Sequence, residues 1–304
     1  MRLITATFFI IASTAVLLAQ DDEGAAKKIS SANSASTNAA EVTPLTLPGA
    51  ETFVYREGKP GPMRLHVFKP KGWSAKDQRP ALVFFFGGGW TKGTPERSAG
   101  YAKWAATLGM VGVAPDYRTK GRFDTSPLES VADGRAALRW VQDHAAELGI
   151  DSKKIVVGGS SAGGHVALWT AIEHTPPGSS KTEAPQGKPA AVILVSPVSD
   201  TSLISGYTPK RFGSNTDALS PVHQLDAKMP PVLVFHGDGD TTVTNRQSIA
   251  LHDKLVAAGN VCEFVNVPTG THGFQTQLPE WKDKSRAIMK EFLTKQQLLP
   301  AAAK

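Results

Sequence analysis

The sequence predicts an α/β fold with a mainly parallel central sheet and helices on both of its faces. Short runs such as residues 80–86 are continuously apolar, as expected of strands buried on both faces. Longer segments with helix-start or helix-stop residues alternate with these runs, and such alternation forms parallel sheets. With 304 residues, 41% of them hydrophobic, the chain is large enough for one domain of this kind.

Eight segments have the composition of strands, and the first two are expected at an edge of the sheet. The predicted strands are residues 52–56, 63–68, 80–86, 110–114, 154–157, 190–195, 231–235 and 261–267. Ligands in such sheets bind outside the carboxyl ends of the strands, so functional residues are sought there.

Five further segments are expected to be helices. These are residues 96–108, 126–148, 162–173, 244–259 and 281–298. The second opens on a Ser-Pro-x-Glu cap at residues 126–129. Thr244 with Gln247 is expected to cap the fourth, and Gly259 to end it. Residues 175–188, rich in Pro, Gly and Ser, are expected to form a surface loop.

The amino-terminal residues have the pattern of an export signal. Arg2 precedes a mostly apolar run at 8–18, which is short for a membrane span, and Ala19 stands before a plausible cleavage site. We expect a signal peptide at 1–19, a flexible linker at 20–44 and the folded domain at 45–304. The protein is therefore predicted to be secreted or periplasmic, without stable membrane insertion after cleavage. An uncleaved anchor is the alternative.

The charges are dispersed along the chain. Lys and Arg number 33 against 27 acidic residues, a formal net charge of +6, and they form no basic block. Nucleic acid is therefore not an expected partner, although a mild attraction to acidic polymers is compatible with this charge. Cys262 is the only cysteine, so no intrachain disulfide can form.

The strongest motif is Gly-Ser-Ser-Ala-Gly at residues 159–163, between a predicted strand and a predicted helix. This context is typical of a nucleophile elbow, whose sharp turn presents a reactive serine beside small residues. Ser161 is the predicted nucleophile. Ser160 is a weaker rival, because a motif centred on it would need glycine where Ala162 stands.

A second motif, Phe-Gly-Gly-Gly-Trp, occupies residues 86–90 at the end of a buried strand. Acyl transfer builds negative charge on a carbonyl oxygen, and glycines let backbone N–H groups approach it closely. The amides of Gly88, Gly89 and Ala162 are the predicted oxyanion hole. A dinucleotide-binding loop is excluded, because Lys92 stands where its third glycine would fall.

Two further motifs follow the last two predicted strands. His-Gly-Asp-Gly-Asp at 236–240 offers a carboxylate, and we favour Asp240 over Asp238, which suits a turn. His236 is interpreted as a loop-shaping histidine. The loop after the last strand carries His272, the predicted base. The chain order Ser161, Asp240, His272 is that of α/β-hydrolases.

Four side chains near these motifs are candidates for contact with the substrate. They are Trp90, Tyr117, Ser160 and His165. His165 lies one helical turn after Ser161, and helix packing is its stronger interpretation. Asp116 and Arg118 are interpreted as a structural ion pair. The segment 201–226 is expected to cover the pocket as a small lid. No residue pattern predicts a metal site.

At these motifs the chain resembles the α/β-hydrolase esterases, in the bacterial branch that includes acetylxylan and feruloyl esterase-like enzymes, near the hormone-sensitive-lipase-like carboxylesterases. The resemblance covers nearly all of residues 45–298. It rests on Gly-Gly-Gly-Trp, Pro-Asp-Tyr-Arg, Gly-Ser-Ser-Ala-Gly-Gly-His, His-Gly-Asp-Gly-Asp and His-Gly-Phe, at residues 87–90, 115–118, 159–165, 236–240 and 272–274.

The resemblance implies ester hydrolysis without metal or organic cofactor. The substrates it implies are short-chain acyl esters of small molecules, or acetyl or feruloyl groups on plant polysaccharide. Phe86 replaces the histidine that usually precedes the triple glycine and helps to shape the oxyanion loop. Oligomeric state stays open.

Two other functions compete with esterase activity. A peptidase similar to the catalytic domain of prolyl oligopeptidase shares two motifs but normally has a second large domain, for which this chain has no room. A noncatalytic binding protein on the same scaffold would normally lack a triad member, whereas all three are present here.

Overall fold

Eight strands form one sheet in the described part of the chain, which in the computed structural model is residues 43–300 without 60, 205–206 and 208–209. The order across the sheet is β1-β2-β4-β3-β5-β6-β7-β8. The strands are β1 (Glu51–Arg56), β2 (Met63–Phe68), β3 (Arg79–Phe85), β4 (Val111–Pro115), β5 (Ile150–Ser160), β6 (Ala191–Val195), β7 (Val232–Gly237) and β8 (Cys262–Val267). The predicted signal peptide and residues 20–42 of the predicted linker lie outside the described residues.

The sheet is mainly parallel, as predicted. β1 pairs antiparallel with β2, and β2 antiparallel with β4, whereas all pairs from β4 to β8 are parallel. The two antiparallel strands are therefore at one edge, where the sequence predicted the first two strands. The α/β fold class is confirmed.

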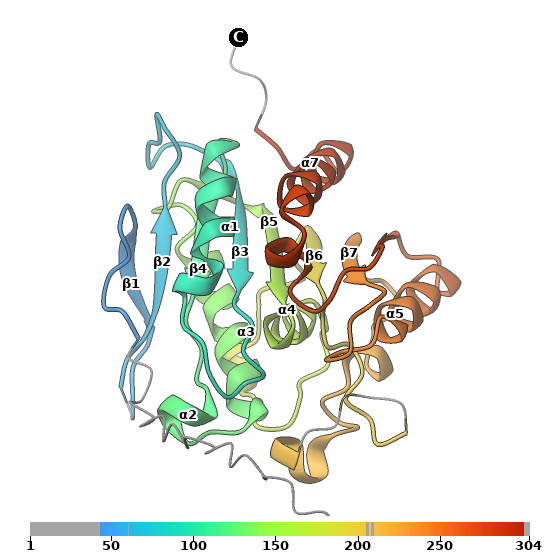
Figure 1. Cartoon of the computed structure of the whole chain (residues 1–304). Coiled ribbons are helices and arrows are strands. Elements are labelled where there is room, and N and C mark those ends of the chain that lie inside the picture. Colours follow the sequence, from blue (N-terminus) through green and yellow to red (C-terminus); the bar gives the residue numbers. More distant parts are fainter. Residues whose placement is uncertain (1–42, 60, 205–206, 208–209, 301–304) are drawn as a thin grey trace, which may run out of the picture. The chain divides into compact units, whose positions relative to one another are not determined.

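Helices cover both faces of the sheet (Figure 1). The α-helices among the described residues are α1 (Glu96–Thr107), α2 (Lys120–Phe123), α3 (Pro127–Asp143), α4 (Ala162–Ala171), α5 (Arg246–Ala257), α6 (Phe274–Gln277) and α7 (Pro279–Lys295). Successive side chains of β3 point to opposite faces of the sheet. Val83 and Phe85 belong to the hydrophobic core that includes α3 and α4. Leu82 and Phe84 belong to the core that includes α1 and α7. Burial on both faces explains why the central strands are apolar without interruption.

The α3 helix confirms its predicted start but not its predicted end. Ser126 and the Glu129 side chain form the expected capping box. The helix ends at Asp143 rather than near 148, and residues 144–149 form turns. The carbonyls of Leu148 and Gly149 accept hydrogen bonds from the Trp73 indole and the Arg79 amide, at 2.9 and 2.8 Å. Hydrogen bonds to distant residues therefore hold this segment in place of a further helical turn.

The predicted cap of α5 is wrong. No side chain caps this helix, because the buried Gln247 side chain accepts hydrogen bonds from the amides of Ser199 and Asp200 instead. The predicted end is confirmed: Gly259 takes the left-handed conformation at φ 78°, and the helix stops there.

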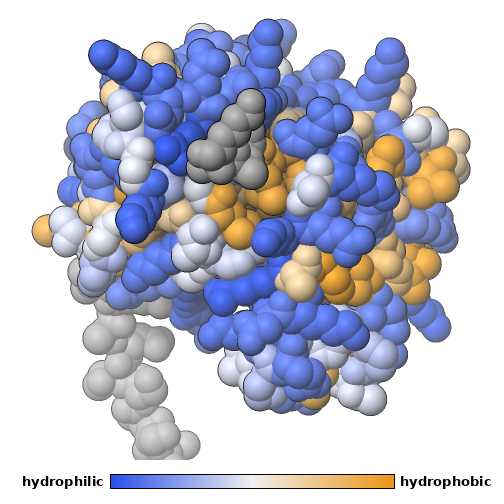
Figure 2. Space-filling view, turned by 90° about the horizontal axis from the view of Figure 1, so that it is seen from above, coloured by the Kyte–Doolittle hydropathy of each residue, from blue (hydrophilic) through white to orange (hydrophobic). Residues whose placement is uncertain are grey.

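The carboxyl ends of the parallel strands gather the predicted motifs. The loops after β3, β5, β7 and β8 meet at this end of the sheet, beside the segment that contains the short 3₁₀ helix η2 (Lys210–Asn215). Figure 2 shows the opposite end of the domain, where hydrophilic side chains surround separate hydrophobic areas. The site therefore lies where parallel α/β sheets bind their ligands.

Candidate active site

Ser161 stands in a strained turn between β5 and α4. Its backbone has φ 53° and ψ −120°, a conformation that a non-glycine residue adopts at a cost of about 1–3 kcal/mol. Backbone hydrogen bonds tie it to the segment after β6: the Ser161 amide donates to the Val195 carbonyl at 3.0 Å, and the Val198 amide donates to the Ser161 carbonyl at 3.3 Å. The turn has the geometry of the predicted nucleophile elbow.

The two glycines of the motif are required by close backbone packing. A Cβ on Gly159 would lie 2.2 Å from the Gly163 carbonyl oxygen, and one on Gly163 would lie 2.3 Å from the Phe86 carbonyl oxygen. Any side chain at either position would displace main chain. The turn at Ser161 therefore packs directly against the end of β3.

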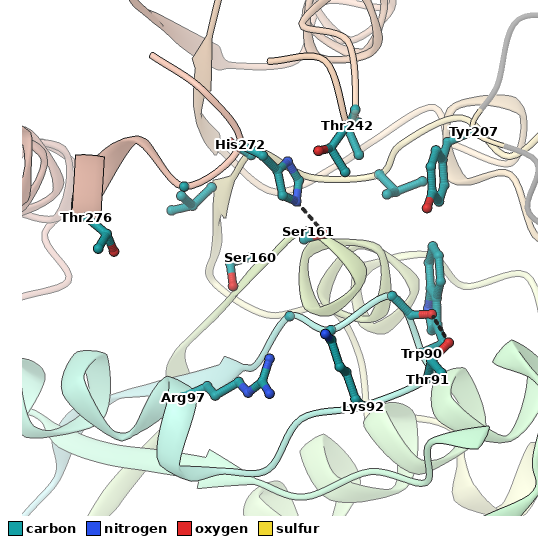
Figure 3. A pocket seen from close by; sticks show the side chains of 18 of the residues that line it. Trp90, Thr91, Lys92, Arg97, Ser160, Ser161, Tyr207, Thr242, His272 and Thr276 are labelled. Atoms are coloured by element: carbon teal, nitrogen blue, oxygen red, sulfur yellow. Dashed lines mark hydrogen bonds between the residues drawn. The ribbon is translucent and has the colours of Figure 1, made fainter. Parts of the chain in front are cut away.

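The predicted serine, histidine and aspartate form one hydrogen-bonded chain. The Ser161 hydroxyl lies 2.8 Å from His272 Nε2, and His272 Nδ1 lies 2.7 Å from Asp240 Oδ2 (Figure 3). A carboxylate can only accept, so Nδ1 carries the ring proton and Nε2 accepts from the hydroxyl. This is the arrangement in which an imidazole removes a serine proton.

Asp240 is held as a carboxylate by several donors. Its Oδ1 accepts from the amides of Thr242 and Val243, both at 2.9 Å, and its Oδ2 accepts from His272 and His236. Burial alone would raise the pKa of Asp240, but the hydrogen bonds from the two histidines and from Val243 outweigh it and lower the pKa well below its usual value.

Asp238, the rival acid, lies at the surface and takes a turn role. Its two oxygens accept from the Asn266 side chain at 3.1 Å and from the Thr269 amide at 2.7 Å. It makes no hydrogen bond to His272. The structure therefore brings Asp240, not Asp238, to the histidine.

His236 has a role that the sequence interpretation missed. It is buried, and its Nε2 lies 2.8 Å from the Val243 carbonyl and 3.1 Å from Asp240 Oδ2. Its Nδ1 lies 2.6 Å from the Ser248 hydroxyl, which donates to it. His236 thus shapes the loop, as interpreted, and also orients Asp240. The four-residue spacing in His-Gly-x-x-Asp is the signal that could have shown this contact.

The glycine loop after β3 lies against the elbow. A Cβ on Gly87 would be 2.9 Å from the Ser160 carbonyl oxygen and 3.2 Å from Ser161 Cβ. Among the described residues, none accepts a hydrogen bond from the amides of Gly88, Gly89 or Ala162. Gly88 and Gly89 line the same pocket as Ser161, and Ala162 follows Ser161 directly in the chain.

Comparisons with known proteins agree with this geometry. The model of the BD-FAE family matches residues 65–255, more than half of the chain. The chain belongs to the BD-FAE family. The matched region includes the glycine loop, Ser161 and Asp240 and ends before His272.

The solved structure of Thermogutta terrifontis esterase 2 in its tabun-modified form is 37% identical, with a TM-score of 0.76, over 84% of this chain and 97% of that chain. The α/β-hydrolase fold of esterases is confirmed. Among curated relatives, the probable carboxylic ester hydrolase LipM of Mycobacterium tuberculosis is 30% identical over 64% of this chain, and the carboxylesterase NlhH of the same species is 29% identical over 66%. The chain spans 49% of LipM and 67% of NlhH.

A pocket of about 760 Å³ opens over the serine in this BD-FAE family member. Trp90 and Ser160 line it, as predicted, and so do Tyr207 and Arg211 from the predicted lid segment. Figure 3 shows Trp90 and Tyr207 at one end of the pocket, and Ser160, Arg97 and Thr276 at the other. The pocket thus has an aromatic end and a polar end, with Ser161 and His272 between them.

The prediction that Tyr117 forms part of the pocket wall is wrong. Tyr117 is fully buried beneath the glycine loop and is absent from the described pocket lining. Its ring stacks on Phe86 with the centroids 4.0 Å apart, and its hydroxyl donates to the Phe86 carbonyl at 2.7 Å. This packing shows how the loop keeps its shape with Phe86 in place of the usual histidine.

The predicted ion pair between Asp116 and Arg118 is also wrong. Asp116 pairs with Arg122 at 2.6 Å, and Arg118 pairs with Asp133 at 2.7 Å. Asp116 and Arg118 each face a different element, so each finds its partner on a helix that follows. Both pairs tie the chain after β4 to the domain and lie outside the pocket lining.

His165 packs inside the domain and is absent from the described pocket lining, so its predicted contact with the substrate is wrong and its helix-packing interpretation is confirmed. Its Nε2 lies 2.7 Å from the Leu219 carbonyl, to which it donates, and its ring meets Trp90 edge to face at 5.1 Å. Burial lowers the pKa of His165 from 6.5 to about 4, against a smaller opposite effect of the hydrogen bond to Leu219.

This burial predicts an acid sensitivity of the fold. Between pH 6.5 and pH 4 an unfolded chain binds a proton at residue 165 that the folded chain does not, so the free energy of unfolding falls as pH falls. From pH 7.5 to 5.0 the contribution is about 2 kcal/mol. Urea unfolding at both pH values measures the free energy of unfolding. Its loss between pH 7.5 and 5.0 should be smaller in His165→Gln than in the natural protein by about that amount. Equal losses in the variant and the natural protein would contradict this.

Neither a metal site nor a membrane span is visible in residues 43–300 apart from their gaps. No three His, Cys, Asp or Glu side chains of these residues are grouped so that they could hold a metal ion. No helix formed by these residues is both long and apolar enough to span a bilayer.

Proposed function

We propose that this protein is a serine carboxylesterase that cleaves short-chain acyl esters through a covalent acyl-enzyme. One observation carries the proposal: Ser161, His272 and Asp240 form a hydrogen-bonded chain with distances of 2.8 and 2.7 Å. Membership in the BD-FAE family and similarity to named esterases support it.

The geometry supplies each part of the first half-reaction. Ser161 Oγ attacks the ester carbonyl carbon while His272 Nε2 takes the hydroxyl proton, and the carbonyl oxygen becomes an oxyanion that the amides of Gly88, Gly89 and Ala162 receive. The intermediate collapses as the carbon–alkoxy bond breaks, and His272 returns the proton to the leaving alcohol.

The second half-reaction uses the same groups in reverse. Water attacks the acyl-enzyme and gives its proton to His272 Nε2, and the bond to Ser161 Oγ then breaks as Oγ regains a proton. Asp240 stabilises the imidazolium formed in both halves. The products are a carboxylic acid and a free serine.

A fluorophosphonate probe tests the nucleophile directly. It should form one covalent adduct, located at Ser161 by peptide mass spectrometry, and Ser161→Ala should prevent labelling. Thermogutta terrifontis esterase 2, which is similar to this chain, has been solved phosphorylated by paraoxon, and this supports such reactivity here. An adduct at Ser160, or none, would contradict the assignment.

We expect a preference for short acyl chains. At the aromatic end of the pocket Trp90 is buried and packs edge to face on Phe212 at 4.8 Å, and Tyr207 lies over it at 6.4 Å. These rings occupy the space that a long chain would need. Structures of the Thermogutta esterase hold propionate and butyrate. Across p-nitrophenyl esters of two to sixteen carbons, kcat/KM should be at least about tenfold higher for two to four carbons than for ten or more.

Two results bear on this preference. Trp90→Ala should move the optimum towards longer chains, because it removes the largest ring at that end of the pocket. A maximum at ten or more carbons in the natural protein would contradict the small acyl site.

We further propose export to the periplasm or medium and action on acetyl or feruloyl groups of plant polysaccharide. The amino-terminal signal pattern at 1–19 and the resemblance to acetylxylan and feruloyl esterase-like enzymes support this. Release of acetate from acetylxylan or of ferulate from methyl ferulate would test it. Activity on p-nitrophenyl acetate with none on either substrate would remove the polysaccharide part alone.

A further inference from the structure

A second cavity, of about 430 Å³, adjoins the active-site pocket. The two cavities share Arg97 and Thr276, so the polar end of the pocket continues into the second cavity. Beyond these residues the second cavity runs between α1 and α7. Its further lining includes Tyr101, Gln275, Lys282 and Arg286. Together the cavities form one cleft, which extends from Ser161 past Arg97 to α7.

The charge of this cleft has one sign. Five basic side chains line it, and none of its described lining residues is Asp or Glu. The five are Lys92, Arg97, Arg211, Lys282 and Arg286. The whole chain carries 27 acidic residues against 33 basic ones, so composition alone does not lead to such an excess. Because the five come from three separate stretches of the sequence, at 92–97, 211 and 282–286, they form no basic block.

Most of these charges are not neutralised by neighbouring carboxylates. Within the described residues, Lys92, Lys282 and Arg286 form no ion pair. Arg211 donates to the Gly89 carbonyl, which leaves its charge intact, and its guanidinium lies 5.9 Å from the Trp90 ring. The field inside the cleft is therefore positive and attracts anions.

The polar end of the pocket and the second cavity lie on the alcohol side of the ester. His272 returns a proton to the leaving alcohol, and Thr276 lies only four residues after it, on α6. In Figure 3, Thr276, Arg97 and Ser160 lie on the side of the pocket away from Trp90 and Tyr207. With the acyl group at the aromatic end, the alcohol leaves towards Arg97 and the second cavity.

We propose that the alcohol part of the natural substrate is an acidic saccharide, with carboxylate or sulfate groups on its sugar units. This inference rests on the proposed esterase function and adds the class of leaving group. One anionic group meets Arg97 near the scissile ester, and another along the chain meets Lys282 and Arg286. A saccharide fits better than a nucleic acid, because the lining also offers the hydroxyl groups of Ser160 and Thr276 beside the cations.

The test compares charged and neutral polymers that carry the same ester. Acetylated polygalacturonate should give a kcat/KM per acetyl group at least about tenfold above that of acetylxylan at low ionic strength. Raising the salt concentration from 20 to about 500 mM should remove most of this difference, because salt screens exposed charges. Acetylated sulfated xylan in place of polygalacturonate distinguishes sulfate from carboxylate as the preferred anion.

Variants locate the effect in the second cavity. The double variant Lys282→Gln, Arg286→Gln should lower the ratio of kcat/KM for acetylated polygalacturonate to that for p-nitrophenyl acetate by roughly 3- to 10-fold, mainly through KM. Lys290→Gln is the matched control, since Lys290 is an exposed cation of the same helix outside both cavities. It should leave this ratio unchanged.

The outcomes separate this inference from the esterase proposal. Hydrolysis of p-nitrophenyl acetate with equal rates on charged and neutral polymers overturns the saccharide inference alone. If no ester is cleaved, the affinity of the Ser161→Ala variant for oligosaccharides tests the saccharide inference. Polygalacturonate oligomers should bind this variant more tightly than neutral xylo-oligomers do. Equal binding, or equally tight binding of a DNA oligonucleotide of the same charge, would overturn the inference.

Discussion

Replacing Ser161 with alanine is expected to lower kcat for p-nitrophenyl acetate on the order of 10⁴-fold or more. The variant keeps the pocket and the three amides but has no atom that can form the acyl-enzyme. His272→Ala should have a comparable effect, because the hydroxyl then loses the base 2.8 Å away. Combining the two should add little, since both act in the same step.

Ser160→Ala is the matched control for the nucleophile. Ser160 stands beside Ser161 and lines the same pocket, but it ends β5 and makes no hydrogen bond to His272. Its loss should change kcat by less than about tenfold. Stopped-flow measurement of the acyl-enzyme burst checks both variants. Near-natural turnover by Ser161→Ala would exclude the proposed mechanism.

The sequence predicted most of the fold because its signals are local. The central strands are buried on both faces, so their apolar runs stand out, and the loops at their carboxyl ends carry the glycine, serine, aspartate and histidine motifs. Glycines at 159 and 163 mark positions where no side chain fits. Motifs of this kind can be read without knowing what packs against them.

What the sequence did not predict depends on tertiary partners. The cap expected at Gln247 fails because two distant amides, at 199 and 200, compete for its side chain. Asp116 and Arg118 are neighbours in sequence, yet each pairs with a residue further along the chain. The four-residue helices α2 and α6 are too short for a periodic pattern.

The basic cleft shows the same limit for the functional site. Its cations come from the glycine loop, α1, the segment before β7 and α7, and only the fold brings them together. In the sequence the positive charges are dispersed, which indicates no particular ligand. A substrate preference of this kind is therefore a property of the folded surface.

Asp240→Asn is expected to lower kcat by roughly 10³- to 10⁴-fold with little change in KM. Oδ2 of Asp240 accepts from both His272 Nδ1 and His236 Nε2, at 2.7 and 3.1 Å. An asparagine side chain has one oxygen and one NH₂ group. It therefore cannot accept hydrogen bonds at both the Oδ1 and the Oδ2 position of the carboxylate. If the NH₂ group faces His272, the imidazole must carry its proton on Nε2 and can no longer accept from Ser161.

The same variant loses the charge that stabilises the imidazolium in both half-reactions. Asp238→Asn is the control, because Asp238 is exposed and its side chain accepts hydrogen bonds from Asn266 and Thr269 rather than from His272. It should keep kcat within a few-fold of the natural protein. Measuring kcat and KM for both variants on p-nitrophenyl acetate decides between the two acids. A large loss in Asp238→Asn with a small one in Asp240→Asn would move the acid to residue 238, whereas the lowered pKa and buried contacts of Asp240 predict the opposite order.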